Sequence, residues 1–203
     1  MKNTIRKIVL LTCLVFLTGG ESCVVDQKVI DVILKEKVCA VFSENSADQE
    51  YMTTETIDYA QEIDDILADN DYVRTDIAEL TVEGGAYGVV SLPDGADWEI
   101  SGSVNVRRVD LGGAPVALID YASEDLRPLI GVEKPASLNA AGVNLLNAAV
   151  EDYLNGSNPV LEFISMGTVD PDPSESNRII FEWKAWVLFA VTLQEELDVF
   201  DPI

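Results

Sequence analysis

The sequence contains no histidine, and this absence excludes more chemistry than any other feature of its composition. Without histidine there is no Ser-His-Asp triad, no Cys-His pair, and no zinc, copper or haem site with a histidine ligand. Cysteine is scarce as well: the chain has three, and Cys13 lies in an N-terminal segment that we expect to be removed. The other two cysteines are too few for a thiolate metal cluster and form no Cys-x-x-Cys motif. A Gly-x-x-x-x-Gly-Lys-Ser/Thr phosphate-binding motif is also missing.

Positive charge is the next scarcity. The chain has 13 lysines plus arginines against 36 aspartates plus glutamates. Three of the basic residues and Glu21 precede Cys23, so residues 23–203 carry 10 positive and 35 negative groups, a net charge of −25. Such a charge repels nucleic-acid phosphates and anionic membranes, so we expect no nucleic-acid partner. The acids are spread along a chain that is 48% hydrophobic, which excludes a disordered acidic tail.

Residues 1–22 have the pattern of an export signal. Lys2, Arg6 and Lys7 form a positive start, an apolar stretch runs from Ile8 to Leu17, and small residues follow. The apolar stretch is too short to span a bilayer, which needs about 20 residues. We therefore expect residues 23–203 to form a single β-sandwich-like domain. The predicted location is the bacterial periplasm, the outer membrane as a lipoprotein, or the extracellular space.

Cys23 follows the predicted signal directly and is a candidate lipid-attachment residue. Ser22 suits the position before a lipoprotein cysteine, whereas Gly20 and Glu21 fit poorly, so lipidation and ordinary cleavage both stay open. A membrane contact is expected only through such an anchor. A bond to Cys39 is disfavoured, because Cys23 reaches at most about 18 Å from Lys28 while an unbroken strand places Cys39 about 36 Å away.

Hydrophobic periodicity divides the rest of the chain into six strands and two helices. Strands are expected at residues 28–43, 77–92, 98–111, 115–121, 160–169 and 178–194, and helices at about 54–70 and 138–155. Residues 44–54 predict a polar loop and residues 170–177 a hairpin loop, while the three strands between 77 and 121 predict an antiparallel meander. The order β-α-β-β-β-α-β-β predicts an α+β, mostly β fold, an antiparallel β-sandwich-like sheet system with two helices.

The last predicted strand is the most apolar segment. Its alternate residues from Ile179 to Leu193 form one hydrophobic face, whereas the other face begins with Glu182 and Lys184 and becomes apolar at Trp186. A central strand that lies under a helix for part of its length would have this pattern. Trp186 points away from the main hydrophobic face, so it is our candidate for a covered second face or a binding surface.

Calcium is the only cofactor that the sequence suggests, because clustered carboxylates are the ligands it prefers. Two acidic loops are candidates, although neither contains the glycine that helps a loop to wrap around the ion, and both also have the composition of ordinary polar turns. The candidate ligands are Asp69, Asp71 and Asp76 in the first loop and Asp170, Asp172 and Glu175 in the second.

Carboxylates also permit glycoside hydrolysis, which needs only an acid and a second acidic group. Glu162, Glu182 and Lys184 lie on predicted strands and could line a cleft. They could equally form a solvent-facing row with a cross-strand ion pair, and the alternating polar pattern of a half-exposed strand favours this second interpretation.

The three tryptophans could form a sugar-stacking platform if they were exposed. Trp183 belongs to the hydrophobic face of the last strand, and Trp98 begins the inner face of the third one. Tryptophan is buried on average, so a place in the core is favoured for both.

The sequence thus predicts an exported, non-catalytic envelope or secreted protein with a structural or binding role, whose partner would be a protein or a glycan. The first alternative is a calcium-assisted module that binds carbohydrate or protein. The second is a carboxylate-only glycoside hydrolase or lyase.

Overall fold

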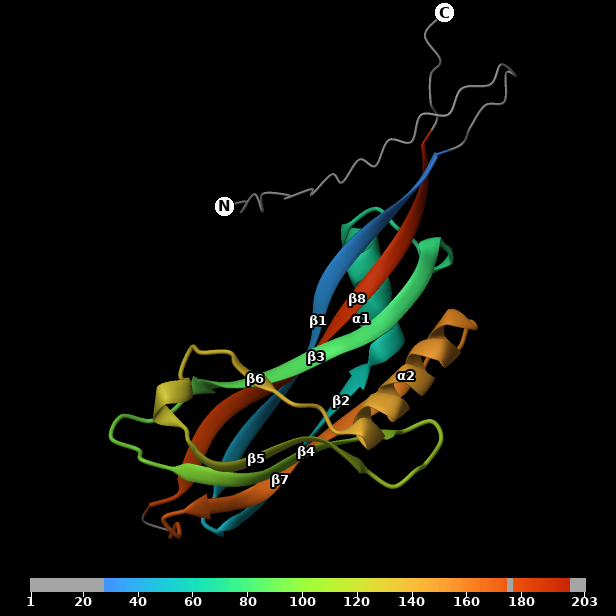
Figure 1. The fold of residues 1–203 in the computed structure, drawn as a ribbon. Helices are drawn as coiled ribbons and strands as arrows, with labels where there is room; N and C mark the ends of the chain where they lie inside the picture. The colour runs from blue at the N-terminus through green and yellow to red at the C-terminus, as the bar shows by residue number, and fades with distance from the viewer. Residues whose placement is uncertain (1–27, 175–176, 198–203) are drawn as a thin grey trace, which may run out of the picture.

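The computed structural model describes residues 28–174 and 177–197, and the counts of elements below refer to these residues. Most of them lie in antiparallel strands that form two four-stranded sheets, and two α-helices lie beside the sheets (Figure 1). The predicted mostly-β, sandwich-like fold with two helices is therefore confirmed.

Sheet A has the strand order β1-β8-β3-β6, and sheet B has the order β2-β7-β4-β5. The strands of sheet A are β1 (Lys28–Ser46), β8 (Ile179–Leu197), β3 (Ile77–Ser91) and β6 (Lys134–Ala136). The strands of sheet B are β2 (Glu50–Asp58), β7 (Val160–Asp170), β4 (Glu99–Arg108) and β5 (Val116–Asp125). Figure 1 shows β1 and β8 running side by side along the molecule, with sheet B against one half of sheet A and the helices beside the other half.

Strand β8 is the centre of sheet A. It pairs with β1 over its whole length, from Lys28 opposite Leu197 to Ser46 opposite Ile179, and with β3 on its other side. Its predicted hydrophobic face is buried at every position: Ile179, Phe181, Trp183, Ala185, Val187, Phe189, Val191 and Leu193. The ring of Tyr59, in helix α1 (Tyr59–Asp69), lies 5.4 Å from that of Phe189. The predicted central position is thus confirmed, whereas the helix contact lies on the main hydrophobic face, and cover of the second face by a helix stays a prediction.

The predicted loop at residues 44–54 is wrong. Strand β1 continues to Ser46, and after a short turn the chain forms β2 from Glu50. Most β2 side chains are polar because this strand is an edge strand, and Tyr51 and Ile57 are its buried residues. The three threonines of β2 have high β-propensity, and this is the feature of the sequence that could have predicted the strand.

The predicted pairing of strands that are neighbours in sequence is correct only for β4 and β5. Strand β3 pairs with β8 and β6, so the three-strand meander is wrong. The predicted hairpin at 170–177 is also wrong, because β7 belongs to sheet B and β8 to sheet A. Short β6 was not predicted. Alternation along a strand reveals which face is buried. It does not reveal the strand's partners, because two sheets that face one core offer each strand the same kind of environment.

A capping side chain fixes the start of α1, whereas the second helix begins without a side-chain cap. Helix α1 starts at Tyr59, and not near Thr54 or Thr56, because the side chain of Asp58 accepts a hydrogen bond from the backbone N–H of Gln61. Helix α2 (Ala140–Leu154) follows Asn139 and ends before Gly156, whose φ of 88° suits the predicted glycine after the helix.

An aromatic cluster joins the two sheets. The ring of Trp183 in sheet A lies 5.3 Å from that of Phe42 on the same sheet and 5.3 Å from that of Tyr121 in sheet B. Tyr51 of sheet B packs edge-on against Phe181 at 6.0 Å. Such edge-to-face contacts add about 0.5–1.5 kcal/mol each beyond the area they bury.

Two glycines lie between the tyrosines of this cluster. Tyr51, Gly167, Gly102 and Tyr121 lie opposite one another across β2, β7, β4 and β5. The two phenol groups reach over the glycines, and their oxygens are 2.7 Å apart. A Cβ atom on Gly102 would overlap the carbonyl oxygen of Met166, so no side chain fits there.

We predict that Gly102→Ala lowers the free energy of unfolding by about 1–3 kcal/mol, the usual cost of overpacking a core. Urea unfolding followed by circular dichroism would measure the change. Gly113→Ala is the matched control, because no atom lies within 4 Å of the Cβ that it adds. Equal stabilities of the two variants would contradict the close approach of β4 and β7.

Candidate functional sites

The first group of predicted calcium ligands is not gathered around one point. Asp69 ends α1, and Asp71 follows in the turn with a φ of 66°. Asp76 ends a 3-10 helix, and its carboxylate accepts a hydrogen bond from the N–H of Val73 at 2.8 Å. In residues 28–174 and 177–197, no group of three or more His, Cys, Asp or Glu side chains is placed to hold a metal ion.

The second predicted calcium loop is only partly described. Asp170 ends β7 and Asp172 is exposed just after it, whereas Glu175 lies outside the described residues. Calcium binding at this loop stays a prediction.

All three tryptophans are buried. Trp183 is 1% exposed, and Trp98 and Trp186 are 4% exposed, so none of them presents an open ring for sugar stacking. Trp186 lies on the second face of β8, as predicted, and this face is covered there. The amino groups of Lys37 and Lys184 lie 5.3 and 5.1 Å from its ring. Trp186 therefore has the covered role and not that of an exposed binding surface.

The acids that could have lined a cleft lie in different sheets. Glu162 is on β7 of sheet B, where its carboxylate is 2.5 Å from the guanidinium of Arg107. Glu182 and Lys184 are on β8 of sheet A. A hydrolytic pair made of Glu162 and Glu182 is not formed.

The predicted signal and Cys23 lie outside the described residues, so export, lipidation and a bond to Cys39 stay untested by the fold. The unbroken β1 on which the disulfide argument depends is present. Cys39 is exposed and forms no disulfide with a described residue, and partial burial raises the pKa of its thiol despite the positive charge of Lys184.

A buried carboxyl group lies between the two sheets, and the sequence analysis missed it. Glu44 is 5% exposed, on the inner face of β1. Thr53 of β2 donates a hydrogen bond to its carboxylate at 2.7 Å, and Ser165 of β7 donates a longer one at 3.4 Å. The alternation of β1 could have predicted this burial. The buried residues of β1 are even-numbered from Val38 onward, and Glu44 continues this series.

The tyrosine pair extends this polar cluster through the core. The hydroxyl group of Tyr121 bonds to that of Tyr51 and also donates to the backbone carbonyl of Met166 at 3.2 Å. Burial raises the pKa of both phenols, that of Tyr121 to about 12, so both are neutral in ordinary buffers. The buried indole N–H of Trp183 has no hydrogen-bond partner of good geometry among the described residues, but it lies near enough to Glu44 to lower the pKa of that carboxyl group.

Burial also raises the pKa of Glu44, and the hydrogen bonds from Thr53 and Ser165 offset this only in part. The raised pKa means that Glu44 keeps its proton more readily here than in water, and the hydroxyl groups of Thr53 and Ser165 both bond to its carboxyl group. The cluster is therefore suited to joining the sheets and to sensing pH through stability.

We predict that Glu44→Gln stabilises the protein at pH 7 to 8 and has little effect below the normal glutamate pKa. The native state retains the proton at a pH where the unfolded carboxyl group has already lost it, so wild-type stability falls as pH rises through this window. The loss is about 1.4 kcal/mol for each unit between the two pKa values.

Thermal unfolding of both proteins between pH 4 and pH 8 would measure this effect. Glu50→Gln, at an exposed position of β2, is the matched control and should show no gain that grows with pH. A difference between wild type and Glu44→Gln that does not change over this range would contradict the prediction.

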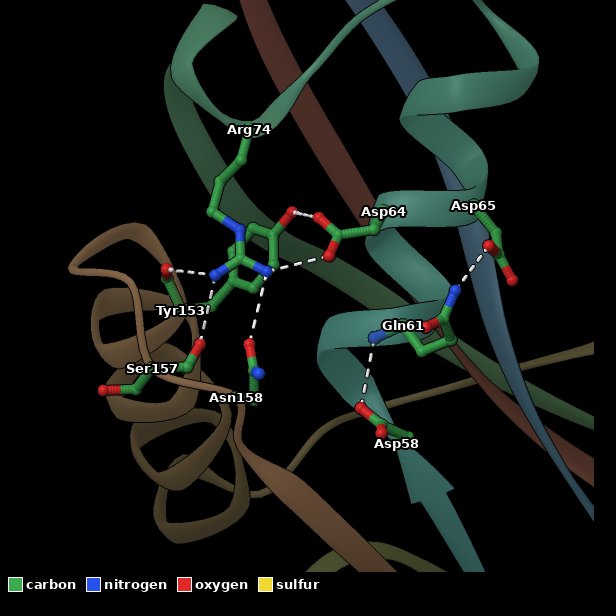
Figure 2. Close-up of polar contacts among 8 residues, drawn as sticks. All are labelled: Asp58, Gln61, Asp64, Asp65, Arg74, Tyr153, Ser157 and Asn158. Carbon is green, nitrogen blue, oxygen red and sulfur yellow. Dashed lines mark hydrogen bonds and ion pairs between the residues drawn. The ribbon is translucent and has the colours of Figure 1, made fainter.

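Arg74 holds the two helices together (Figure 2). Its guanidinium group lies 2.8 Å from the carboxylate of Asp64 on α1 and 3.9 Å from the ring centre of Tyr153 on α2. It also donates to the backbone carbonyl of Ser157, just after α2, at 3.2 Å. The hydroxyl group of Tyr153 donates to Asp64 at 2.6 Å, which closes the triangle.

The charges in this group agree with that role. Burial disfavours ionisation of Asp64, but the hydrogen bonds from Arg74 and Tyr153 outweigh it and lower the pKa of Asp64. The arginine is thus matched to an ionised partner and connects α1, the segment before β3, and the end of α2.

We predict that Arg74→Ala lowers the free energy of unfolding by about 1–2 kcal/mol, since a stacked cation and several hydrogen bonds are lost together. Lys35→Ala is the control, because the pair of Lys35 and Glu83 is mostly exposed and should contribute less than about 0.5 kcal/mol. Urea unfolding measures both, and similar losses in the two variants would contradict the role of Arg74.

A second arginine is fully buried and fully paired. Arg108 of β4 is bound by the carboxylates of Asp110 and of Asp152, the latter on α2. The hydrogen bonds that Arg108 donates to Asp110 raise its pKa, and the one that it donates to Asp152 adds to this. Arg108 therefore fixes α2 to sheet B, as Arg74 fixes it to α1.

Two surface hollows lie outside these clusters. One of about 660 Å³ follows the glycine row of sheet B and is lined by Glu50, Tyr51, Met52, Gly102, Ser103, Met166, Gly167 and Thr168. The other, of about 400 Å³, lies between β3 and α2 and is lined by Leu80, Thr81, Val82, Asn147, Val150, Glu151 and Leu154.

Neither α1 nor α2, the α-helices of the described residues, is long and apolar enough to cross a membrane. A scan of the sequence against protein-family models finds no match, and a search of curated proteins finds none either.

Proposed function

We propose that this is an exported, non-catalytic protein of the cell envelope or the extracellular space, with a structural or binding role. The observation that carries the proposal is the use of its buried polar side chains. Glu44, Arg108 and Ser165 are the buried polar or charged residues of the described core, and each bonds to a partner on another element. These groups support the scaffold, which is what a structural or binding protein requires.

Export is supported by the order of charge, apolar stretch and small residues in residues 1–22. The net charge of −25 on residues 23–203 is consistent with a solvated surface that keeps an exported protein apart from nucleic acid and anionic membranes. The periplasm, the outer membrane and the extracellular space remain the proposed locations, with Cys23 as the proposed lipid-attachment residue.

The binding part of the proposal is supported by the two hollows, each of which combines apolar and hydrogen-bonding groups. The hollow between β3 and α2 also lies beside a strand edge, and a partner is proposed for it below.

Export predicts a mature protein that lacks residues 1–22. Expression of the full chain in a bacterial host, followed by intact mass measurement of the purified product, would locate the cleavage site and reveal acyl chains on Cys23. Leu14→Arg interrupts the apolar stretch and is the control, since it should leave the chain unprocessed. An uncleaved wild-type chain in the cytosol would refute export.

The same purified protein serves for the catalytic alternative. No turnover is expected on a panel of chromogenic glycosides and esters. Turnover would favour the carboxylate-only hydrolase or lyase and end the non-catalytic proposal.

A further inference from the structure

Strand β3 has an open edge beside helix α2. One edge of β3 pairs with β8, whereas β6 covers the other edge only from Gly85 to Tyr87. In the part of the chain that the structure describes, no strand pairs with this second edge between Ile77 and Gly84. Backbone N–H and C=O groups of alternate residues therefore point from it without a ladder partner, and such an edge is a template for an additional strand.

Helix α2 forms the second wall of a groove along this edge. Leu80, Val82 and Val150 contribute apolar surface, and Leu154 is partly exposed at the rim. Asn147 and Glu151 add polar groups on the helix side. An extended segment laid along β3 would place alternate side chains on α2, which is the geometry of β-strand addition.

The groove has fixed ends. At Gly85 the edge is taken over by β6, and before β3 the guanidinium of Arg74 binds the last turn of α2. Register shifts in the pairing with β8 between Ile77 and Glu79 and between Val82 and Gly84 leave a regular open segment from Glu79 to Val82. Four residues at about 3.3 Å each give a site about 13 Å long.

We propose that this groove binds an extended polypeptide segment of a partner protein, which adds to sheet A as a strand beside β3. The inference rests on the proposed binding role and names its partner class. The backbone edge would supply hydrogen bonds, and the apolar surface of α2 would accept alternate hydrophobic side chains.

The negative charge of the groove favours a cationic segment. Its lining contains Glu151 and no lysine or arginine, and the exposed Glu79 lies on the open segment. The only arginine at its end, Arg74, is matched by Asp64. A second copy of this chain would bring like charges together on an already acidic protein, so a partner with lysine or arginine between apolar residues fits better.

The test uses a ten-residue peptide of alternating valine and lysine with the mature protein, residues 23–203. Fluorescence anisotropy measures affinity, and amide hydrogen exchange locates the bound segment. Binding should slow exchange at Glu79–Val82. A peptide of the same charge with proline in place of valine should not bind, because proline cannot pair as a strand, and a valine–glutamate peptide should not bind either.

Two charge-reversal variants distinguish binding in the groove from non-specific attraction of a cationic peptide to an acidic protein. Glu151→Lys should weaken the valine–lysine peptide about tenfold. Glu55→Lys, which makes the same change in net charge at an exposed position of β2, should alter its affinity less than about twofold. Unchanged melting temperatures would verify that both variants are folded.

The inference would be overturned by no binding at millimolar peptide, by equal effects of the two reversals, or by protection confined to β1. A concentration-dependent dimer with protection at Glu79–Val82 would assign the groove to a second copy and would also overturn it. None of these outcomes affects the proposed exported, non-catalytic role, which is tested separately by intact mass and by the substrate panel.

Discussion

The contact of Trp183 with aromatic rings from both sheets is the interaction on which the rest of the structure depends. Its strand, β8, is the middle of sheet A, and Tyr121 reaches it from the edge of sheet B. Because the ring of Trp183 contacts Phe42 as well, the sheets and the long β1–β8 pair are positioned together. Tyr51, whose hydroxyl group bonds to that of Tyr121, can approach because Gly167 has no side chain: a Cβ atom there would lie 2.9 Å from the Tyr51 hydroxyl oxygen. Aromatic packing and the glycine row are therefore one constraint.

The buried polar groups of this core lie where hydrogen bonds connect the two sheets. Burial outweighs the hydrogen bonds of Glu44 and raises its pKa, so this carboxyl group keeps its proton more readily than an exposed one and the cost of an unpaired buried charge is reduced. The two arginines act through ion pairs instead. Arg74 and Arg108 each bind carboxylates on other elements, and α2 is held from two sides as a result. Helix α2, held in this way, forms one wall of the groove beside the open edge of β3.

The predictions from sequence succeeded where one residue pattern has one physical meaning. The apolar face of β8, the glycine after α2 and the buried Trp98 and Trp183 all follow from periodicity or composition. The predictions failed where a run of polar residues was interpreted as a loop. Strand β2 is polar because it lies at an edge, and Glu44 is buried although its residue type is usually exposed. The groove could not be predicted, since its two walls come from segments more than sixty residues apart.

The sequence by itself determined the acidity, the high content of alternating strands, the exclusion of histidine chemistry and the expectation of export. Only the tertiary structure decided which strands are neighbours, why Trp186 is covered and where polar groups meet. The physical reason is that alternation records which side of a strand faces the core, whereas partner choice depends on long-range packing. Both sheets face the same core, so a hydrophobic face fits either of them until Trp183, the glycine row and the arginine contacts select one arrangement.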